Sequence, residues 1–146
     1  IKSLSESNVE IRCDSKSYNE IKKYNYNKVL KSSKSDWGKE FLDLILSIKC
    51  VYSIEEAISH IYDYGSGHTD GIISESKNSI ETFVNNIDSA AIMVNASTQF
   101  NDGGEFGLGA EVAISTNKYG ARGPMGLENL CSYKWILTGK GNIRIR

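Results

Sequence analysis

The sequence lacks the features that point to a membrane, a nucleic acid or a metal ion. No apolar run approaches the roughly 18 residues that span a bilayer, and we expect no signal peptide in the first residues. The 17 Lys and Arg side chains nearly balance the 18 Asp and Glu, so a net charge of −1 gives no electrostatic reason to expect a nucleic acid or an anionic membrane. The 3 cysteines lack metal-type spacing. We therefore expect none of these three ligand classes.

An initiator methionine and an even number of cysteines are missing as well. The chain starts with Ile1, so we expect it to begin inside a longer polypeptide. Cys13, Cys50 and Cys131 are odd in number, and reduced thiols in the cytoplasm are the simplest account of them. We therefore expect a cytoplasmic protein.

The composition that is present describes one globular domain. The 146 residues are 40% apolar and 24% charged, and a chain of this length buries roughly two thirds of its surface. Extended and helical patterns alternate, which predicts an α/β fold with a parallel sheet and crossover helices. The expected strands are residues 9–12, 42–52, 69–74, 90–94 and 112–116, and the expected helices are 17–24, 53–65, 79–87 and 127–132.

The clearest helix has signals at both ends. Ser53 and Glu56 have the spacing of a capping box. Gly65 lies where a left-handed C-terminal cap favours glycine. Ahead of this helix, the apolar centre of residues 42–52 predicts a strand buried over most of its length, whereas the polar residues 24–35 predict a surface loop.

A glycine-dense stretch follows the buried strand at residues 90–94. Residues 102–109 contain four glycines, which allow positive φ angles and close approach of another group. Loops that leave the ends of buried strands often carry the chemistry of α/β proteins. A connector that needs glycine only for its bends explains the composition equally well.

Three local patterns suggest a phosphate-binding loop, and none fits. Residues 65–67 (Gly-Ser-Gly) come after a helix and before a strand, the reverse of a dinucleotide fingerprint. Residues 104–109 lack the final glycine and do not open a helix, and no Gly-Lys-Ser sequence occurs. The sequence therefore contains no self-contained nucleotide site.

Three polar residues are candidates for chemistry, each with a plain alternative. His68 lies between glycine and small polar residues at the start of a strand, although a single histidine is more often a structural hydrogen-bonding residue. Arg122 could bind a carboxylate or phosphate, or hold a turn through backbone carbonyls. Glu40 could accept hydrogen bonds from sugar hydroxyls, or be a surface carboxylate.

Longer motifs go beyond these single residues. They are Val51, Ala57-Ile58, His60-Ile61, residues 64–70 (YGSGHTD) and Ile72, followed by residues 88–91, 94–98 (VNAST), 106–111 (FGLGAE) and 121–128 (ARGPMGLE). Together they resemble the γ-glutamyl phosphate reductase family, also called glutamate-5-semialdehyde dehydrogenase, of the aldehyde dehydrogenase superfamily. The resemblance covers nearly the whole chain, most firmly from residue 37 onwards.

The resemblance implies a reaction. Members of this family use NADPH to reduce L-glutamyl 5-phosphate to glutamate 5-semialdehyde with release of phosphate, the second step of proline biosynthesis. A cysteine thiolate takes the acyl group as a thioester before the hydride arrives.

The resemblance also implies that part of the enzyme lies elsewhere. The family's nucleophilic cysteine, in an Ala-Cys-Asn context, and most of the dinucleotide contacts lie upstream of the residues matched here. Cys13, Cys50 and Cys131 do not occupy that context. The chain therefore resembles the C-terminal part of the enzyme, and we expect it to be inactive alone.

Site roles follow from the same resemblance. Glu40 matches the superfamily glutamate that binds the ribose next to the nicotinamide, and His68 is expected near the thioester or the phosphate it replaces. Arg122 is the expected anion contact, although Gly120 stands where relatives often have histidine. The expected substrate-entrance loop consists of Asn95, Ser97, Thr98, Phe106 and Gly107.

The end of the chain is expected to join subunits. Residues 133–137 and 143–145 flank a glycine-containing turn and predict a terminal strand or hairpin. We expect residues 1–130 to belong to the catalytic domain and residues 131–146 to form an oligomerisation strand. The expected partners are L-glutamyl 5-phosphate, a second copy of the chain and the upstream half of the enzyme.

A second hypothesis belongs to another class of protein. The chain could be a freestanding non-catalytic module for subunit association or small-anion binding. The encoded upstream sequence separates the two hypotheses, since an in-frame Ala-Cys-Asn context favours the reductase.

Overall fold

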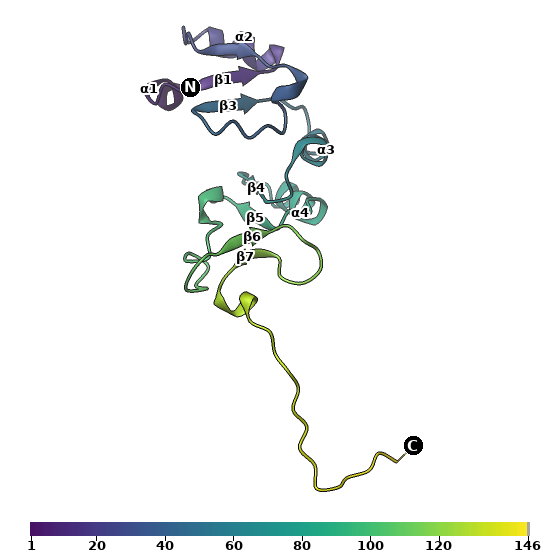
Figure 1. The fold of residues 1–146 in the computed structure, drawn as a ribbon. Coiled ribbons are helices and arrows are strands. Elements are labelled where there is room, and N and C mark those ends of the chain that lie inside the picture. The colour runs from purple at the N-terminus through teal and green to yellow at the C-terminus, as the bar shows by residue number, and fades with distance from the viewer. Residues whose placement is uncertain (146) are drawn as a thin grey trace.

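The computed structural model describes residues 1–145 and contains three small sheets joined by short helices (Figure 1). The first sheet is parallel and has the order β2-β1-β3. The second is a parallel pair, β4-β5, and the third an antiparallel pair, β6-β7. Parallel pairing with helices between the strands confirms the predicted α/β class.

The first sheet packs its inner face against one helix. It consists of β1 (Glu10–Cys13), β2 (Val29–Lys31) and β3 (Ile45–Ile48), preceded by α1 (Lys2–Glu6). The crossover from β1 to β2 is α2 (Ser15–Lys22), which Asp14 caps by accepting hydrogen bonds from the amides of Lys16 and Ser17. Ile11 and Cys13 of β1 are fully buried, and they form one apolar cluster with Ile21 of α2 and Val29 of β2.

One helix connects this sheet to the second one, and another helix links the two strands of the second sheet. α3 (Ile54–Tyr64) leads from β3 to β4 (Thr69–Ile72), and α4 (Lys77–Asn86) then crosses over to β5 (Ala91–Val94). α3 and α4 contact each other, and Phe83, Ile87 and Met93 are the buried apolar side chains of this half. In Figure 1, α3 lies between the first sheet and the other two.

The remaining elements close the lower half of the molecule. The turn η2 (Thr98–Phe100) follows β5, β6 (Ala113–Ser115) pairs with β7 (Gly123–Met125), and η3 (Leu127–Leu130) comes last. The predicted strand over residues 112–116 is therefore confirmed. The partner strand β7 lies within the ARGPMGLE motif, since Ser115 pairs with Gly123.

Three sequence-based expectations for local structure are wrong. Val29 lies in a strand inside the predicted loop, because its pairing with Ile11 outweighs the polar residues around it. Leu44, just before β3, and Leu46 within it are exposed, because the helix that covers this sheet, α2, packs mainly on β1 and β2. Gly65 has φ −70°, so the chain leaves α3 extended instead of left-handed.

The start of α3 agrees with its signal in part. Ser53 Oγ accepts a hydrogen bond from the amide of Glu56 at 3.3 Å, as in a capping box. The carboxylate of Glu56, however, accepts from the amide of Tyr52 at 2.9 Å, one residue before the expected partner. The Ser53 contact satisfies an amide that the first turn of a helix leaves free, and the Glu56 contact holds the residue before the cap.

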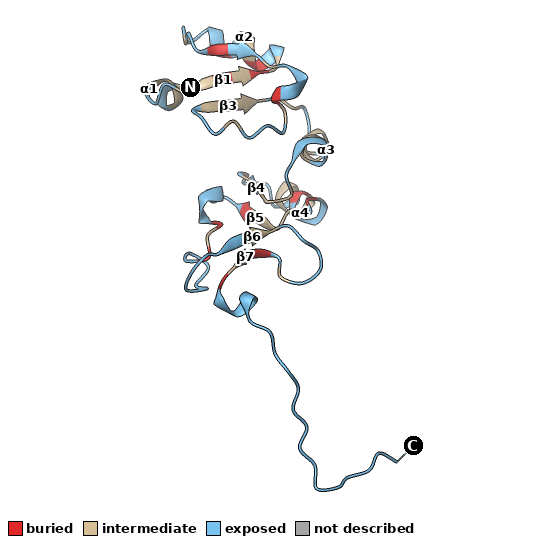
Figure 2. Ribbon diagram, in the orientation of Figure 1, coloured by how far each residue is buried: buried red, intermediate tan, exposed pale blue. Residues whose placement is uncertain are grey.

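Residues 131–145 extend away from the rest of the chain (Figures 1 and 2). No helix or strand forms in this segment, and its large apolar side chains are exposed. These are Tyr133, Trp135, Ile136, Leu137, Ile143 and Ile145. The expected oligomerisation strand therefore stays a prediction, and Arg146 lies outside the described residues.

Among residues 1–145, none of the helices has both the length and the apolar character needed to cross a bilayer.

Asp36 ties the loop before β3 to the first sheet. Its carboxylate accepts hydrogen bonds from the amide and hydroxyl of Ser33, at 2.7 and 2.8 Å, and from Arg12 Nη1 at 2.7 Å. These contacts with Ser33 and with the Arg12 guanidinium lower the pKa of Asp36 to about 2. The folded state thus holds a proton on Asp36 less readily than the unfolded state does.

This difference predicts a loss of stability in acid. The contribution of Asp36 to the free energy of unfolding should be complete above its unfolded pKa of about 4. This contribution should vanish as pH falls toward about 2. Over that pH range, the free energy of unfolding measured in urea should fall less for Asp36→Asn than for the unaltered chain. Asp63→Asn, on the exposed side of α3, is the matched control. An equal pH slope in the unaltered chain and Asp36→Asn would contradict the assignment.

Candidate functional site

Glu40 and His68 line the same cleft, although Glu40 precedes the last strand of the first sheet and His68 precedes the first strand of the second. The cleft has a volume of ≈ 520 Å³. It lies where the loop before β3 meets the end of α3 and the start of β4. Its lining consists of Gly38, Lys39, Glu40, Tyr64, Ser66, His68, Thr69 and Thr116. We call it the Glu40–His68 cleft.

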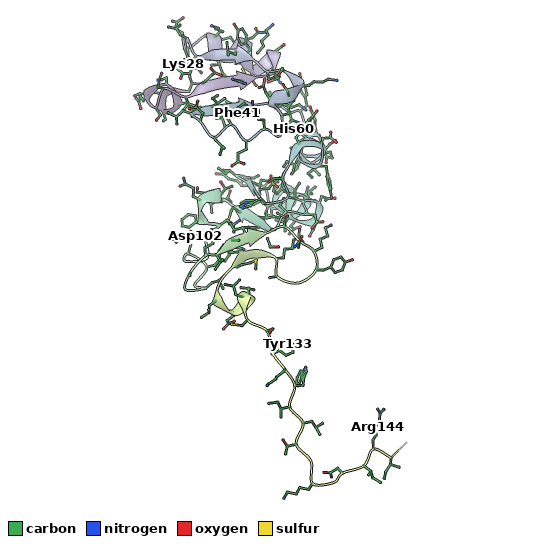
Figure 3. All side chains as sticks on the ribbon, viewed as in Figure 1. Lys28, Phe41, His60, Asp102, Tyr133 and Arg144 are labelled. Carbon is green, nitrogen blue, oxygen red and sulfur yellow. The ribbon has the colours of Figure 1, made fainter. Side chains whose placement is uncertain are left out.

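A close backbone contact holds the Glu40 loop in place. Gly38 has φ +71°, and an added Cβ would lie 2.7 Å from the carbonyl oxygen of Tyr64. Only glycine therefore allows the loop to pack against the last residue of α3. Phe41 of this loop lies against the first sheet, where the Arg12 guanidinium carbon is 4.9 Å from its ring centroid (Figure 3). The contact brings Glu40 to the residues that follow α3.

Hydrogen bonds hold both the imidazole and the backbone of His68. Its Nδ1 lies 2.5 Å from Thr69 Oγ1, and its backbone amide donates to Ser66 Oγ at 3.2 Å. Thr69 Oγ1 also accepts from Asn101 Nδ2 at 2.6 Å. Asn101 is a buried residue that follows η2. The imidazole is therefore held by its neighbours while it lines the cleft.

The cleft combines groups suited to a polar, hydroxyl-bearing ligand. The exposed carboxylate of Glu40 can accept hydrogen bonds from two neighbouring hydroxyls. The ammonium of Lys39, which stacks at 5.3 Å over the Phe41 ring, adds a positive charge. His68 and Thr69, also in the lining, supply a ring nitrogen that can donate a hydrogen bond and a hydroxyl.

Arg122 lies outside this cleft and is bound to Asp88. Its Nη2 donates to the Asp88 carbonyl and to Asp88 Oδ1, both at 2.8 Å. Lys118 pairs with the same carboxylate, and hydrogen bonds from Lys118 and Arg122 lower the pKa of Asp88. The contacts tie the β6–β7 loop to the segment before β5. This geometry agrees with the structural alternative for Arg122, and its role as an anion contact stays a prediction.

The five expected substrate-entrance residues also lie away from the lining of the Glu40–His68 cleft. Asn95 has φ +53°, and its side chain makes two hydrogen bonds to the backbone of Ser74. Asn95 Oδ1 accepts from the Ser74 backbone amide at 2.8 Å, and Asn95 Nδ2 donates to the Ser74 carbonyl at 3.0 Å. Ser97 Oγ accepts from the amide of Gln99 and caps η2. It also lines a separate hollow of ≈ 250 Å³ with Gln99, Phe100 and Glu105.

Thr98, Phe106 and Gly107 complete this group. Thr98 accepts a hydrogen bond from the amide of Asn101 and so helps to position the asparagine behind Thr69. Phe106 is exposed, and Gly107 has φ +75° with open space around it. A role in substrate entrance stays a prediction for all five residues.

A second hollow borders the first and contains the other histidine. It has a volume of ≈ 370 Å³ and shares Gly38 and Tyr64 with the Glu40–His68 cleft. His60 lies between Trp37 and Tyr64, with ring centroids 5.2 and 4.8 Å away (Figure 3). Burial, and then the charge of Lys49, lowers the pKa of His60. The uncharged imidazole is thus the form that the fold favours.

Sequence reasoning identified Glu40 and His68 but missed their supporting residues. Thr69 was visible as part of the YGSGHTD motif, and Thr116 as a polar residue ending a strand. Asn101 carried no signal, because nothing local marks an asparagine that packs against a strand far earlier in the chain. Pairing of β4 with β5 brings it there.

The fold and the cleft together define a class of protein. Parallel strands with crossover helices, and a polar cleft beside the end of α3 and the start of β4, are those of an α/β protein with a ligand-sized site. No protein-family model matches the chain.

Similar proteins narrow this class to one family. A γ-glutamyl phosphate reductase of Dehalococcoides mccartyi is 51% identical over 140 residues, which cover 96% of this chain and 33% of that protein. The reductase of Clostridium beijerinckii is 48% identical over 144 residues, with 99% and 34% covered. The crystal structure of the Thermotoga maritima γ-glutamyl phosphate reductase superposes with a TM-score of 0.87 at 42% identity, covering 98% of this chain and 33% of that one.

The chain belongs to the γ-glutamyl phosphate reductase family, as the sequence motifs indicated. It spans about one third of the length of these relatives, which is consistent with the expected C-terminal part.

The Gly38–Tyr64 contact predicts a large effect of a single methyl group. Gly38→Ala adds both left-handed strain and a clash with the Tyr64 carbonyl. Gly120→Ala is the matched control, because Gly120 has φ +85° but open space. In urea unfolding, the free energy of unfolding of the control should fall by about 1 kcal/mol. That of Gly38→Ala should fall by at least about 2 kcal/mol. Equal losses would mean that the close approach to Tyr64 contributes nothing.

His60 predicts a second, separate pH dependence. Since its pKa is lowered in the folded state, the unfolded state binds a proton first as pH falls below the ordinary value of 6.5. Stability should therefore drop from neutral pH toward about pH 5. His60→Phe should flatten this part of the curve, measured by urea unfolding at each pH. An unchanged slope would show that His60 does not cause it.

Proposed function

We propose that the chain is the C-terminal part of an enzyme that reduces L-glutamyl 5-phosphate to L-glutamate 5-semialdehyde with NADPH and releases phosphate, a step of proline biosynthesis. The observation that carries the proposal is the shared cleft: Glu40 and His68, the two residues that the family motifs single out for cofactor and chemistry, line it together. Family membership over nearly the whole chain supports the same assignment.

The residues of the cleft fit part of a nicotinamide dinucleotide. An exposed carboxylate in a polar cleft suits the paired hydroxyls of a ribose, because an ionised carboxylate only accepts hydrogen bonds. Glu40 would hold the ribose next to the nicotinamide, and NADP, when bound, would supply the hydride. Most of the cofactor's contacts would belong to the part of the enzyme outside this chain.

His68 would act on the acyl group. A histidine at the lining of the cleft can donate a hydrogen bond to an oxygen on which negative charge develops. In the proposed reaction this oxygen belongs to the thioester or to the leaving phosphate. Such a contact favours acyl transfer to a cysteine outside this chain.

The cysteines of the chain support an external nucleophile. Cys13 is fully buried, and burial raises its pKa, which disfavours the reactive thiolate. The cleft is lined by eight residues, none of which is Cys13, Cys50 or Cys131. We therefore propose that the chain is inactive alone and acts together with the upstream half of the enzyme.

The remaining site residues and partners are proposed on the family resemblance. Asn95, Ser97, Thr98, Phe106 and Gly107 would form the substrate entrance. Arg122 would bind the substrate's anion only by sharing or leaving Asp88, so the geometry supports its structural role more strongly. A homo-oligomer and a cytoplasmic location follow from the same resemblance, with residues 131–146 as the strand that joins subunits.

A chimaera tests the proposed reaction. This chain would replace the matching third of the Thermotoga maritima enzyme, and NADPH oxidation with L-glutamyl 5-phosphate would be followed. We expect turnover from the chimaera and none from the chain alone. Glu40→Gln should raise KM for NADPH about tenfold, and His68→Ala should lower kcat by about 10²-fold or more. A folded chimaera that binds NADPH without turnover, or turnover by the chain alone, would contradict the proposal.

The exposed apolar tail favours a second candidate, an association module. Six large apolar side chains without a covering element are unusual for a monomer. If association is the whole function, the chain alone should form stable oligomers in sedimentation equilibrium, Trp135→Asp should dissociate them, and the chimaera should lack reductase activity.

A further inference from the structure

A chain of hydrogen bonds runs from the interior to the imidazole at the cleft. Asn101 Nδ2 donates to Thr69 Oγ1 at 2.6 Å, and Thr69 Oγ1 lies 2.5 Å from His68 Nδ1. Asn101 is only 8% exposed. The three residues thus connect a buried amide with a side chain that lines the Glu40–His68 cleft.

The backbone holds Thr69 and Asn101, the two residues of this hydrogen-bond series that lie behind His68. Thr69 lies in β4, in register with Ala91 of β5. Asn101 follows η2, and its own amide donates to the carbonyl of Thr98 at 3.1 Å. A burial of this extent leaves the Asn101 side chain little room for another rotamer. The hydrogen bonds to His68 therefore start from a rigid support.

The chemistry of the groups allows these hydrogen bonds to run from Asn101 through Thr69 to His68. A side-chain amide nitrogen donates and does not accept, so Thr69 Oγ1 is the acceptor of the Asn101 bond. The single hydroxyl proton of Thr69 is then free to point at His68 Nδ1. An Nδ1 that accepts a hydrogen bond leaves the proton of a neutral imidazole on Nε2.

We propose that Asn101 is a positioning residue that, through Thr69, fixes both the orientation and the Nε2–H form of His68. Resting on the proposed function, this arrangement supplies the proton donor that the acyl or phosphate oxygen of the substrate requires. Asn101 itself does not touch the substrate. Thr69 transmits its effect and also lines the cleft.

Packing alone does not account for an asparagine at this position. Asn101 Oδ1 is buried without a hydrogen-bond partner among the described residues. An unpaired buried acceptor lowers stability, whereas an apolar side chain of similar shape would not. A structural role therefore favours Leu at position 101, and the positioning role favours Asn.

Nitrogen-15 NMR of the imidazoles tests the proposal directly. The chain has 2 histidines, so a histidine-labelled sample gives two resolvable ring systems. At alkaline pH, His68 should be in the Nε2–H form, with the Nδ1–H form below detection. In Asn101→Leu and in Thr69→Val, the Nδ1–H form should rise to its share in free histidine. Asn86→Leu, the same change at an exposed position of α4, should leave His68 unaltered.

The outcomes separate the roles cleanly. A predominant Nδ1–H form in the unaltered chain would overturn the proposal without any variant, because the hydrogen bonds would then run the other way. An unaltered His68 spectrum in a folded Asn101→Leu or Thr69→Val would overturn it as well. Urea unfolding should show Asn101→Leu to be at least as stable as the unaltered chain.

The kinetics of the chimaera provide a second, independent test of the positioning role. In the chimaera, Asn101→Leu should lower kcat while KM for NADPH stays constant, since Glu40 is untouched. The NMR readout needs no turnover, so failure of the proposed reaction leaves the test of positioning intact. If His68 changes its form while kcat does not, Asn101 does not serve the reaction, and the positioning proposal fails in its catalytic part.

Discussion

The approach of Gly38 to the carbonyl of Tyr64 is the contact on which the site depends. It joins the loop before β3 to the end of α3, and so connects the first sheet with the half of the chain that contains β4 and β5. Glu40 and His68 lie on either side of that contact and line one cleft. A side chain at position 38 would push the two linings apart, because the neighbouring atom is backbone and cannot move aside cheaply.

The ion pairs of the chain stabilise its structure, whereas the cleft offers groups that can bind a ligand. Asp36 with Arg12, and Asp88 with Arg122 and Lys118, hold loops onto sheets. The Glu40–His68 cleft instead leaves a carboxylate open and backs an imidazole with a hydroxyl and a buried amide. Unused hydrogen-bonding capacity on a rigid support is what a binding site needs. This contrast is why we assign chemistry to Glu40 and His68 and mainly structure to Arg122.

Much of the fold could be predicted from local patterns. Periodicity located β1, α3, α4 and β5, because their apolar spacing matches one face of a strand or helix. It failed for Val29, whose burial comes from pairing with Ile11 and not from its polar neighbours. The division into separate sheets was also hidden, since strand order depends on contacts between distant segments. At the site, motif resemblance indicated Glu40 and His68, whereas the position of Asn101 beside Thr69 depends on the pairing of distant segments.

The central claim is that Glu40 and His68 serve one reacting ligand. The most direct measurement is a crystal structure of the complete encoded polypeptide with NADP bound. The account predicts the ribose next to the nicotinamide within hydrogen-bonding distance of the Glu40 carboxylate, with the His68 imidazole on the same cleft. A nicotinamide bound elsewhere, with Glu40 and His68 both facing solvent, would contradict it.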